Sequence, residues 1–209
     1  MPNLLKLQKP SPTLTKYASE IARLAPGPIL DVPCGYARNA RLMNSLGCSV
    51  VCLDSNVMAL QAIFDDSYRL WPFTNFKQGI ESAGSLMPIL ANLGKDSWPF
   101  GPGTFGAIIN VHFHMESLYE YFDLSLRPGG FLYCETISGR GGNYLELPKA
   151  GELQHKLQRS FEFEVYKEKR TGPQSQDAVT VTLLGRKKTT AQAVMSEIKL
   201  ANPQQDSMY

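Results

Sequence analysis

The sequence predicts a single α/β domain built on a doubly wound, Rossmann-like sheet of about seven strands, most of them parallel. The chain has 209 residues, enough for one sizeable hydrophobic core. Apolar, β-rich runs alternate with helix-like stretches along it, as in sheets whose strands are connected by helices. The last two runs follow each other without a helical stretch between them, which predicts a C-terminal antiparallel hairpin.

The expected elements follow one another in a regular order. The stretch "PSPTLTKYASEIARLAPG" predicts a helix over about residues 12–25, ended by a Pro and a Gly. The first four strong strand-like runs are nearly continuously apolar, which predicts strands covered on both faces. The strong runs are "PILDVP", "SVVCLD", "FGAIINVHF", "FLYCETI", "FEFEVYKE" and "AVTVTLLGR", and a weaker one is "NFKQGI". Helices are expected at residues 38–46, 57–66, 115–126 and 151–159.

These elements form one domain over residues 1–209, with a core at about 28–186 and a tail at about 187–209 that is expected to fray. Right-handed crossovers place the carboxyl ends of the first, second and fourth strands along a single edge of the sheet, where the weaker run counts as the third strand. Open α/β sheets bind their ligands at that edge. The residues at these strand ends are therefore the candidates for a functional site.

Composition narrows the classes of function. Hydrophobic residues make up 43% of the chain, charged residues 19%, and the formal net charge is +2, which is ordinary for a soluble protein and does not favour a nucleic-acid partner. No apolar run approaches the ~20 residues of a membrane helix, and the N-terminus lacks a signal-peptide pattern, so we expect a cytoplasmic protein with no membrane partner. The four cysteines contain no C-x-x-C pair and are expected to be free thiols.

The stretch "PILDVPCGYARNARLMNSLGCSVVCLDSN" carries the most chemistry. It lacks the third glycine of a dinucleotide-binding turn and the Gly-Lys-Ser/Thr of a P-loop. Asp31 precedes the turn and would repel a pyrophosphate held at the helix N-terminus. A cationic ligand fits better, with Gly35 and Ala37 allowing close backbone approach. Asp54, at the end of the second strand, is placed to accept hydrogen bonds from a ribose diol.

A ligand with a cationic group near Asp31 and a sugar near Asp54 matches S-adenosylmethionine. The motif "ILDVPCGYARNARLM…VVCLD" resembles the first two motifs of the class I methyltransferases. "WPFGPGTFGAIINVHF" and "LRPGGFLYCETI" are similar to their fourth and fifth strands. The continuation "ETISGRGGNYLELPKAGEL" resembles the small bacterial tellurite-resistance-type subgroup, compared with which residues 81–97 look like an insertion, expected as an extra helix.

The resemblance implies a set of residues around the cofactor. Adenine is expected near Gly79 and Ile80, where the acidic residue often found after the third strand is absent. Ala37 replaces the usual second glycine, which a negative φ would tolerate. The remaining expected contacts are Asp31, Pro33, Gly35 and Tyr36 at the methionine end, Asp54 and Ser55 at the ribose, and Asn110 on the methyl side.

Candidate catalytic residues follow the fourth and fifth strands. His112 and His114 alternate, so they are expected to share one face beside the transferred methyl. His112 is the candidate general base or acceptor-orienting residue, and Glu135 the candidate acceptor contact. A metal needs at least a third ligand, and His155 is the only other histidine, so no metal is expected. The loop at residues 140–144 is expected to be a mobile lid.

Two other functions remain open from the sequence. A nicotinamide-dependent oxidoreductase is disfavoured by the missing glycines. A non-catalytic module that binds a nucleoside or S-adenosylmethionine is kept open by Ala37 and Gly79. The chain shows no added recognition domain, which favours a small-molecule methyl acceptor, while RNA and protein acceptors stay possible.

Overall fold

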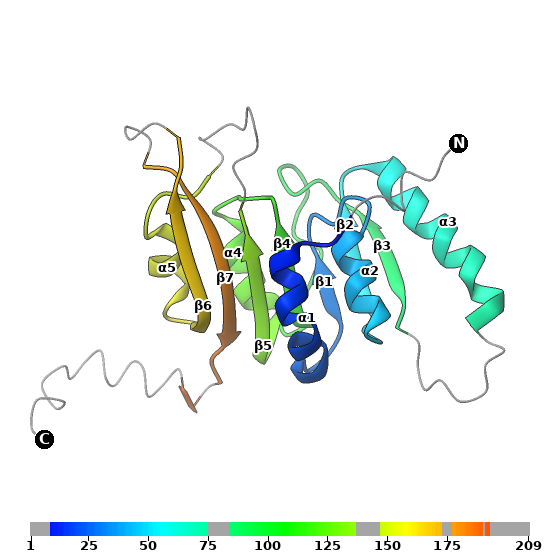
Figure 1. Ribbon diagram of the computed structural model, residues 1–209, viewed down its shortest axis with the longest axis horizontal. Helices are drawn as coiled ribbons and strands as arrows, with labels where there is room; N and C mark the ends of the chain where they lie inside the picture. The colour runs from blue at the N-terminus through cyan, green and yellow to red at the C-terminus, as the bar shows by residue number, and fades with distance from the viewer. Residues whose placement is uncertain (1–8, 75–83, 137–146, 173–176, 190, 193–209) are drawn as a thin grey trace, which may run out of the picture.

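The computed structural model describes residues 9–74, 84–136, 147–172, 177–189 and 191–192, with the side chains of residues 66–74 left out. Its centre is a seven-stranded sheet in the order β3-β2-β1-β4-β5-β7-β6 (Figure 1). The strands are β1 Ile29–Asp31, β2 Val50–Asp54, β3 Leu86–Leu90, β4 Phe105–Val111, β5 Leu126–Glu135, β6 Phe161–Arg170 and β7 Val179–Lys187. The helices are α1 Pro12–Leu24, α2 Arg38–Ser45, α3 Val57–Thr74, α4 Leu118–Ser125 and α5 Glu152–Leu157.

The strand directions confirm the expected doubly wound sheet. Every pairing from β3 to β5 is parallel. Only β7, which lies between β5 and β6, is antiparallel to both of its neighbours. The carboxyl ends of the parallel strands therefore lie along one edge, which carries Asp31, Asp54, Val111 and Glu135 as the last strand residues.

Two hydrophobic clusters cover the two faces of the sheet. Successive strand residues point to opposite faces, and accordingly Ile108 belongs to the cluster with α4 and α5, whereas Ile109 belongs to the cluster with α1, α2 and α3. Every residue of β4 is buried. Burial on both faces explains why the central strands read as unbroken apolar runs. None of the helices in the described part of the chain is long and apolar enough to cross a membrane.

The third strand differs from the expectation. It is β3, Leu86–Leu90, which pairs with β2, whereas the expected strand at residues 75–80 lies outside the described residues. The segment 81–97, expected as a helical insertion, thus carries a strand of the sheet. Pro88 makes this run a poor candidate for a central strand, but β3 is an edge strand, where a missing N–H is tolerated. In addition, α3 continues to Thr74, past its expected end at residue 66.

Candidate active site

The turn after β1 contains a buried carboxyl group with one unpaired oxygen. The Asp31 side chain is 1% exposed. Its Oδ2 accepts a hydrogen bond from the Ala40 amide in the first turn of α2, at 2.9 Å, while its Oδ1 is buried without a partner. Burial raises the pKa of Asp31 to about 8, against the opposing effects of the Ala40 N–H and the Arg38 cation. The side chain is therefore largely protonated near neutral pH.

Asn110, on the neighbouring strand β4, has a similar unpaired oxygen. Its Nδ2 donates to the carbonyl of Val32 at 2.8 Å, and its Oδ1 is buried without a partner. Asp31 pairs in register with Ile109, so Asn110 follows directly at the same edge of the sheet. Buried polar atoms in folded proteins are normally hydrogen-bonded. Two unpaired polar oxygens at one edge therefore indicate a polar ligand, and one that brings N–H donors and a positive charge would pair with both once Asp31 is ionised.

The backbone of the turn is open on one side at Gly35. This glycine has a φ of 52°, and a Cβ added there would meet no heavy atom within 4 Å. Its amide donates to Asp54 Oδ2 at 2.7 Å. Pro33 and Tyr36 are half-buried in the same turn. A ligand can thus approach the backbone of this turn closely, as the sequence predicted.

Asp54 connects the turn after β1 with the turn after β2. Besides the Gly35 amide, it accepts a hydrogen bond from the Asn56 amide, through Oδ1 at 2.8 Å. The N-cap of α3 is a different residue, Asn56, whose Oδ1 accepts from the amides of Met58 and Ala59. Each carboxylate oxygen has a further lone pair, so Asp54 retains acceptor capacity for hydroxyl groups. Ser55, beside it, is exposed.

Ala37 does not have the negative φ that the sequence analysis required of it. Its φ is 60°, in the left-handed region, at the residue that precedes α2. The side chain is fully buried, and the amide donates to the carbonyl of Cys34 at 2.9 Å. Alanine pays about 1–2 kcal/mol for a left-handed backbone. The turn is therefore held in this conformation by its surroundings and not by the preference of residue 37.

Ala37→Gly is expected to change the free energy of unfolding by less than about 1 kcal/mol. The variant relieves the left-handed strain, which stabilises the fold. It also loses the burial of one methyl group, about 0.8 kcal/mol, and adds freedom to the unfolded chain, and these two losses offset the gain. Ala37→Val adds volume to a buried left-handed site and is expected to destabilise by at least about 2 kcal/mol. Urea unfolding of both variants checks this. Strong destabilisation by glycine would contradict the left-handed assignment.

His112 and His114 follow the end of β4 and have different surroundings. The strand ends at Val111 as expected, and His112 follows with a φ of 65° and an exposed side chain. Both ring nitrogens of His112 lie 3.3 Å from Nη2 of Arg38, the first residue of α2. Burial lowers the pKa of His112 and Arg38 lowers it further, whereas Glu135 opposes them. The imidazole thus lies beside the start of α2 and not beneath the sheet.

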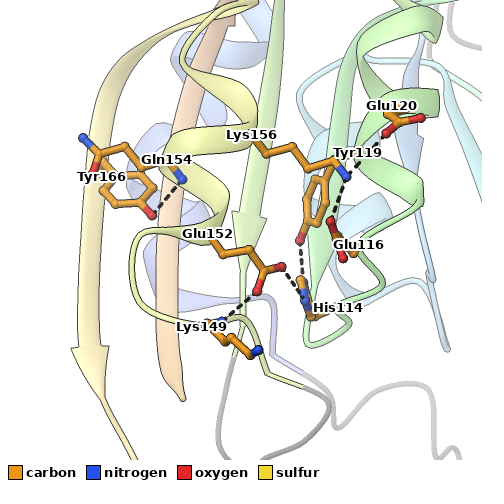
Figure 2. Close-up of polar contacts among 9 residues, drawn as sticks. All are labelled: His114, Glu116, Tyr119, Glu120, Lys149, Glu152, Gln154, Lys156 and Tyr166. Carbon is orange, nitrogen blue, oxygen red and sulfur yellow. Dashed lines mark hydrogen bonds and ion pairs between the residues drawn. The ribbon is translucent and has the colours of Figure 1, made fainter. Parts of the chain in front are cut away.

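His114 lies elsewhere, so the expectation that the two histidines share one face is wrong. Figure 2 shows His114 between Tyr119 and Glu152. Its Nδ1 is 3.1 Å from the Tyr119 hydroxyl and its Nε2 is 3.4 Å from Glu152 Oε1. Burial lowers the pKa of His114, against the opposing effect of Glu152. With both ring nitrogens in contacts, His114 fastens the loop after β4 to α5.

Glu135 fastens the start of α1 to the same edge. Its Oε2 accepts hydrogen bonds from the hydroxyl groups of Ser11 and of Tyr133, the latter at 2.9 Å. Ser11 is the N-cap of α1, and its amide donates to Oδ1 of Asn39 at 2.9 Å. Sequence reasoning missed Ser11, although a serine before a proline at the first position of a helix is a known N-cap pattern.

Comparisons with solved structures identify the fold of this chain. No protein-family model matches the chain, and no curated protein matches its sequence. Among solved structures, a SAM-dependent methyltransferase from Methanosarcina mazei has a TM-score of 0.58 at 16% identity, over 87% of this chain and 99% of that one. TehB from Haemophilus influenzae has a TM-score of 0.57 at 16% identity, over 83% of this chain and 62% of that one. The fold is that of the S-adenosylmethionine-dependent methyltransferases.

The methyltransferase fold alone does not determine the reaction. The [4+2]-cyclase SpnF shares it, with a TM-score of 0.60 at 16% identity over 85% of this chain and 80% of that one. Function in such folds depends on the residues of the site.

The location of β3 bears on the expected adenine position. The expectation for Gly79 and Ile80 depended on a strand at residues 75–80, and both residues lie outside the described ones. The strand beside β2 is instead β3, so the residues that follow it at the carboxyl edge are 91–93. The Ala91 amide donates to the carbonyl of Asp54 at 3.1 Å. Asn92 therefore lies next to the residue that joins the carboxyl end of β3 to the end of β2.

Two further expectations concern a lid and a metal. The loop at residues 140–144 lies outside the described residues. Within the described part of the chain, no group of three or more His, Cys, Asp or Glu side chains is arranged to hold a metal ion.

Proposed function

We propose that this protein is an S-adenosylmethionine-dependent methyltransferase of the class I type that acts on a small-molecule acceptor. The observation that carries the proposal is the pair of buried, unpaired acceptors, Asp31 Oδ1 and Asn110 Oδ1, at the carboxyl edge of β1 and β4. The ammonium group at the methionine end of S-adenosylmethionine supplies N–H donors and a positive charge. A ligand of that kind satisfies both oxygens and favours the ionised form of Asp31.

The residues present fit the whole cofactor. The open Gly35 turn, with Pro33 and Tyr36, accommodates the methionine end beside Asp31 and Asn110. Asp54 and Ser55 are placed for the ribose hydroxyls, and residues 91–93 for the adenine. The binding residues on this proposal are Asp31, Pro33, Gly35, Tyr36, Asp54, Ser55, Asn92 and Asn110. No metal is part of it.

When bound, S-adenosylmethionine supplies an electrophilic methyl group on a sulfonium. Because the sulfonium loses its charge during transfer, a strong anion beside it would stabilise the starting state more than the transition state. The protein's task is mainly to hold the acceptor in line at near-attack distance. His112 lies on the acceptor side, and Glu135 serves by fixing the start of α1 beside it.

His112→Ala is expected to lower turnover more than cofactor affinity. The imidazole contacts Arg38 and is proposed to face the methyl acceptor, and it is not among the proposed cofactor contacts. Replacement by Asn or Gln should retain more activity than Ala if the histidine only orients the acceptor, and no more than Ala if it removes a proton. Single-turnover rates and calorimetric affinities measured on the same preparations separate the two effects. An equal loss in both would place His112 at the cofactor instead.

A thermal-shift series tests the proposed cofactor. S-adenosylmethionine and S-adenosylhomocysteine should raise the melting temperature in a concentration-dependent way, since a ligand that binds only the folded state stabilises it by mass action. NAD should not. Stabilisation by NAD alone would favour an oxidoreductase. Stabilisation by S-adenosylmethionine without transfer of labelled methyl to any metabolite in a pool would favour a binding module.

A small acceptor is preferred because the formal net charge of the sequence is only +2, which does not favour a nucleic-acid acceptor. Incubation with labelled S-adenosylmethionine and separate pools of small metabolites, RNA and protein tests this directly. Label that appears only in the RNA or the protein pool would overturn the small-molecule assignment.

A further inference from the structure

His112 has a backbone conformation that a non-glycine residue rarely adopts. Its φ of 65° falls in the left-handed region, which costs energy for any residue with a Cβ. Such residues gather at functional sites, where the surrounding structure enforces them. Because of this φ, the alternation of side chains along β4 ends at His112. The ring points toward the start of α2, where it contacts Arg38. The contact is therefore enforced at an energetic cost.

Arg38 contacts the face of the imidazole and does not hydrogen-bond to it along the ring plane; this face contact is called a stack below. Nη2 of Arg38 lies 3.3 Å from both Nδ1 and Nε2. In a neutral imidazole one nitrogen carries an N–H and the other a lone pair, and both lie in the ring plane. They point away from each other, and the Cε1–H group lies between them. An atom equidistant from both nitrogens at this range cannot lie in the ring plane and lies over the ring face. Guanidinium groups stack on aromatic faces in this way.

The stack leaves the in-plane lone pair of the imidazole unused. No other side-chain hydrogen bond of His112 exists among the described residues, and the side chain is exposed. A ring that is fixed through its face but free at its edge can still accept a proton. His114 differs, because the hydroxyl of Tyr119 and the carboxylate of Glu152 occupy its two nitrogens (Figure 2).

Two charged groups of opposite sign face His112 from the neighbouring elements. Arg38 comes from α2, and its Nη1 is held by the carbonyl of Lys9 at 3.3 Å. Glu135 comes from β5; its carbonyl accepts the His112 amide at 2.7 Å, and its carboxylate is fixed by Ser11 and Tyr133. Burial and Arg38 lower the pKa of His112, while Glu135 opposes them. The uncharged imidazole is thereby favoured, with an anion close enough to offset a transient positive charge.

We propose that Arg38 is a positioning residue for His112: it stacks on the imidazole and presents the free ring nitrogen to a methyl acceptor that must lose a proton. This rests on the proposed methyltransferase function and names the acceptor class as a hydroxyl, a thiol or a neutral amine that carries an N–H, each of which attacks through a lone pair. The acceptor's bond to hydrogen breaks as its bond to the methyl carbon forms, and the sulfur–carbon electron pair stays on sulfur. The proton moves to the ring nitrogen of His112, and the imidazolium then releases it to water.

Proton NMR titration of the histidine side chains tests the coupling without any acceptor. The chain has three histidines, so His112→Gln, His114→Gln and His155→Gln assign every signal. Arg38→Gln is expected to move the His112 midpoint upward, and Glu135→Gln to move it downward. Arg38→Lys keeps the charge and should leave the midpoint low while changing the ring chemical shifts, because the planar stack is lost. High salt should reduce the effect of Arg38→Gln.

Lys167→Gln is the matched control, since Lys167 is an exposed cation on β6 and its loss should leave the His112 midpoint unchanged. Arg38→Met replaces Arg38→Gln if the latter unfolds. An unchanged His112 midpoint in the folded Arg38 variant, or a shift equal to that of Lys167→Gln, would overturn the coupling. If wild-type protein fails to bind S-adenosylhomocysteine, the proposed function fails whatever the titration shows.

The acceptor class has its own test. Acceptors labelled by the wild-type protein should carry the methyl group on an oxygen, sulfur or nitrogen atom that has lost a proton. His112→Gln should slow the formation of these products. Products formed only from thioethers or tertiary amines, which have no proton to lose, would overturn the assigned class while leaving the methyltransferase proposal intact.

Discussion

Asp31→Asn is expected to weaken the binding of S-adenosylmethionine by about 10–150-fold, the loss that corresponds to one hydrogen bond with a charged group. The side-chain oxygen of asparagine can still accept from the Ala40 amide, as Oδ2 of Asp31 does at 2.9 Å. Its NH2 group then occupies the place of the unpaired Oδ1. A donor would thus face the ammonium donors of the ligand, and the attraction of opposite charges would be lost. Calorimetry on the two proteins measures the difference.

The same variant is expected to remove a pH dependence of stability. The folded-state pKa of Asp31 is raised from 3.8 to about 8 by burial, so between these values the folded protein holds a proton that the unfolded chain has lost. The contribution of Asp31 to stability is therefore fully present below pH 4 and is lost as the pH rises toward 8. Urea unfolding at pH 5.5 and pH 8.5 should show a smaller decline for Asp31→Asn than for wild type.

Ligand binding supplies an independent check on Asp31. If the ammonium group favours the ionised carboxylate, binding at pH 6–7 releases a proton from wild-type protein and none from Asp31→Asn. Binding enthalpies measured in buffers of different ionisation enthalpy report that proton. Equal proton release by both proteins would remove Asp31 from the ammonium site.

Asp54→Ala is expected to lower both affinity and stability. The variant removes the acceptor for the part-buried amides of Gly35 and Asn56, and each lost hydrogen bond costs about 0.5–1.5 kcal/mol. It also removes the proposed contact to the ribose, which should weaken S-adenosylhomocysteine binding by about 10–150-fold. Denaturant unfolding and calorimetry on one preparation give the two quantities.

Asn56→Ala is the control for Asp54→Ala. It removes the N-cap of α3, whose Oδ1 accepts from Met58 and Ala59, and should cost about 1 kcal/mol of stability with affinity retained. Asp54 would lose its assigned place in the site if Asp54→Ala showed the same pattern as Asn56→Ala, with reduced stability and intact affinity.

The sheet could be predicted where its strands are buried on both faces. β1, β2 and β4 are short apolar runs with no exposed position, so composition alone indicates them. β3 could not be found in this way, because an edge strand is half-exposed and tolerates Pro88. The strand beside β2 was therefore expected at residues 75–80, and the segment that forms it was expected to be helical.

The places of Asp31 and Asp54 at the carboxyl ends of β1 and β2 could be predicted, because each ends a buried apolar run. The site could not be predicted where backbone conformation decides. The alternation of His112 and His114 holds only within a strand, and the left-handed backbone of His112 breaks it. Ala37 likewise gives no sequence signal of its positive φ. The contact between Ser11 and Glu135 joins residues 124 positions apart, beyond the reach of any local pattern.

The position of Pro88 also bears on how the molecule avoids self-association. An edge strand offers a row of N–H and C=O groups to which a strand of another molecule can add. β3 is such an edge, and its Met87 and Leu90 side chains are 40% and 60% exposed, which would make an added strand favourable. Because proline has no N–H, its place on this strand must be one whose amide points outward. Pro88 thus interrupts the outer row of donors and works against intermolecular sheet growth at this partly apolar edge of the sheet.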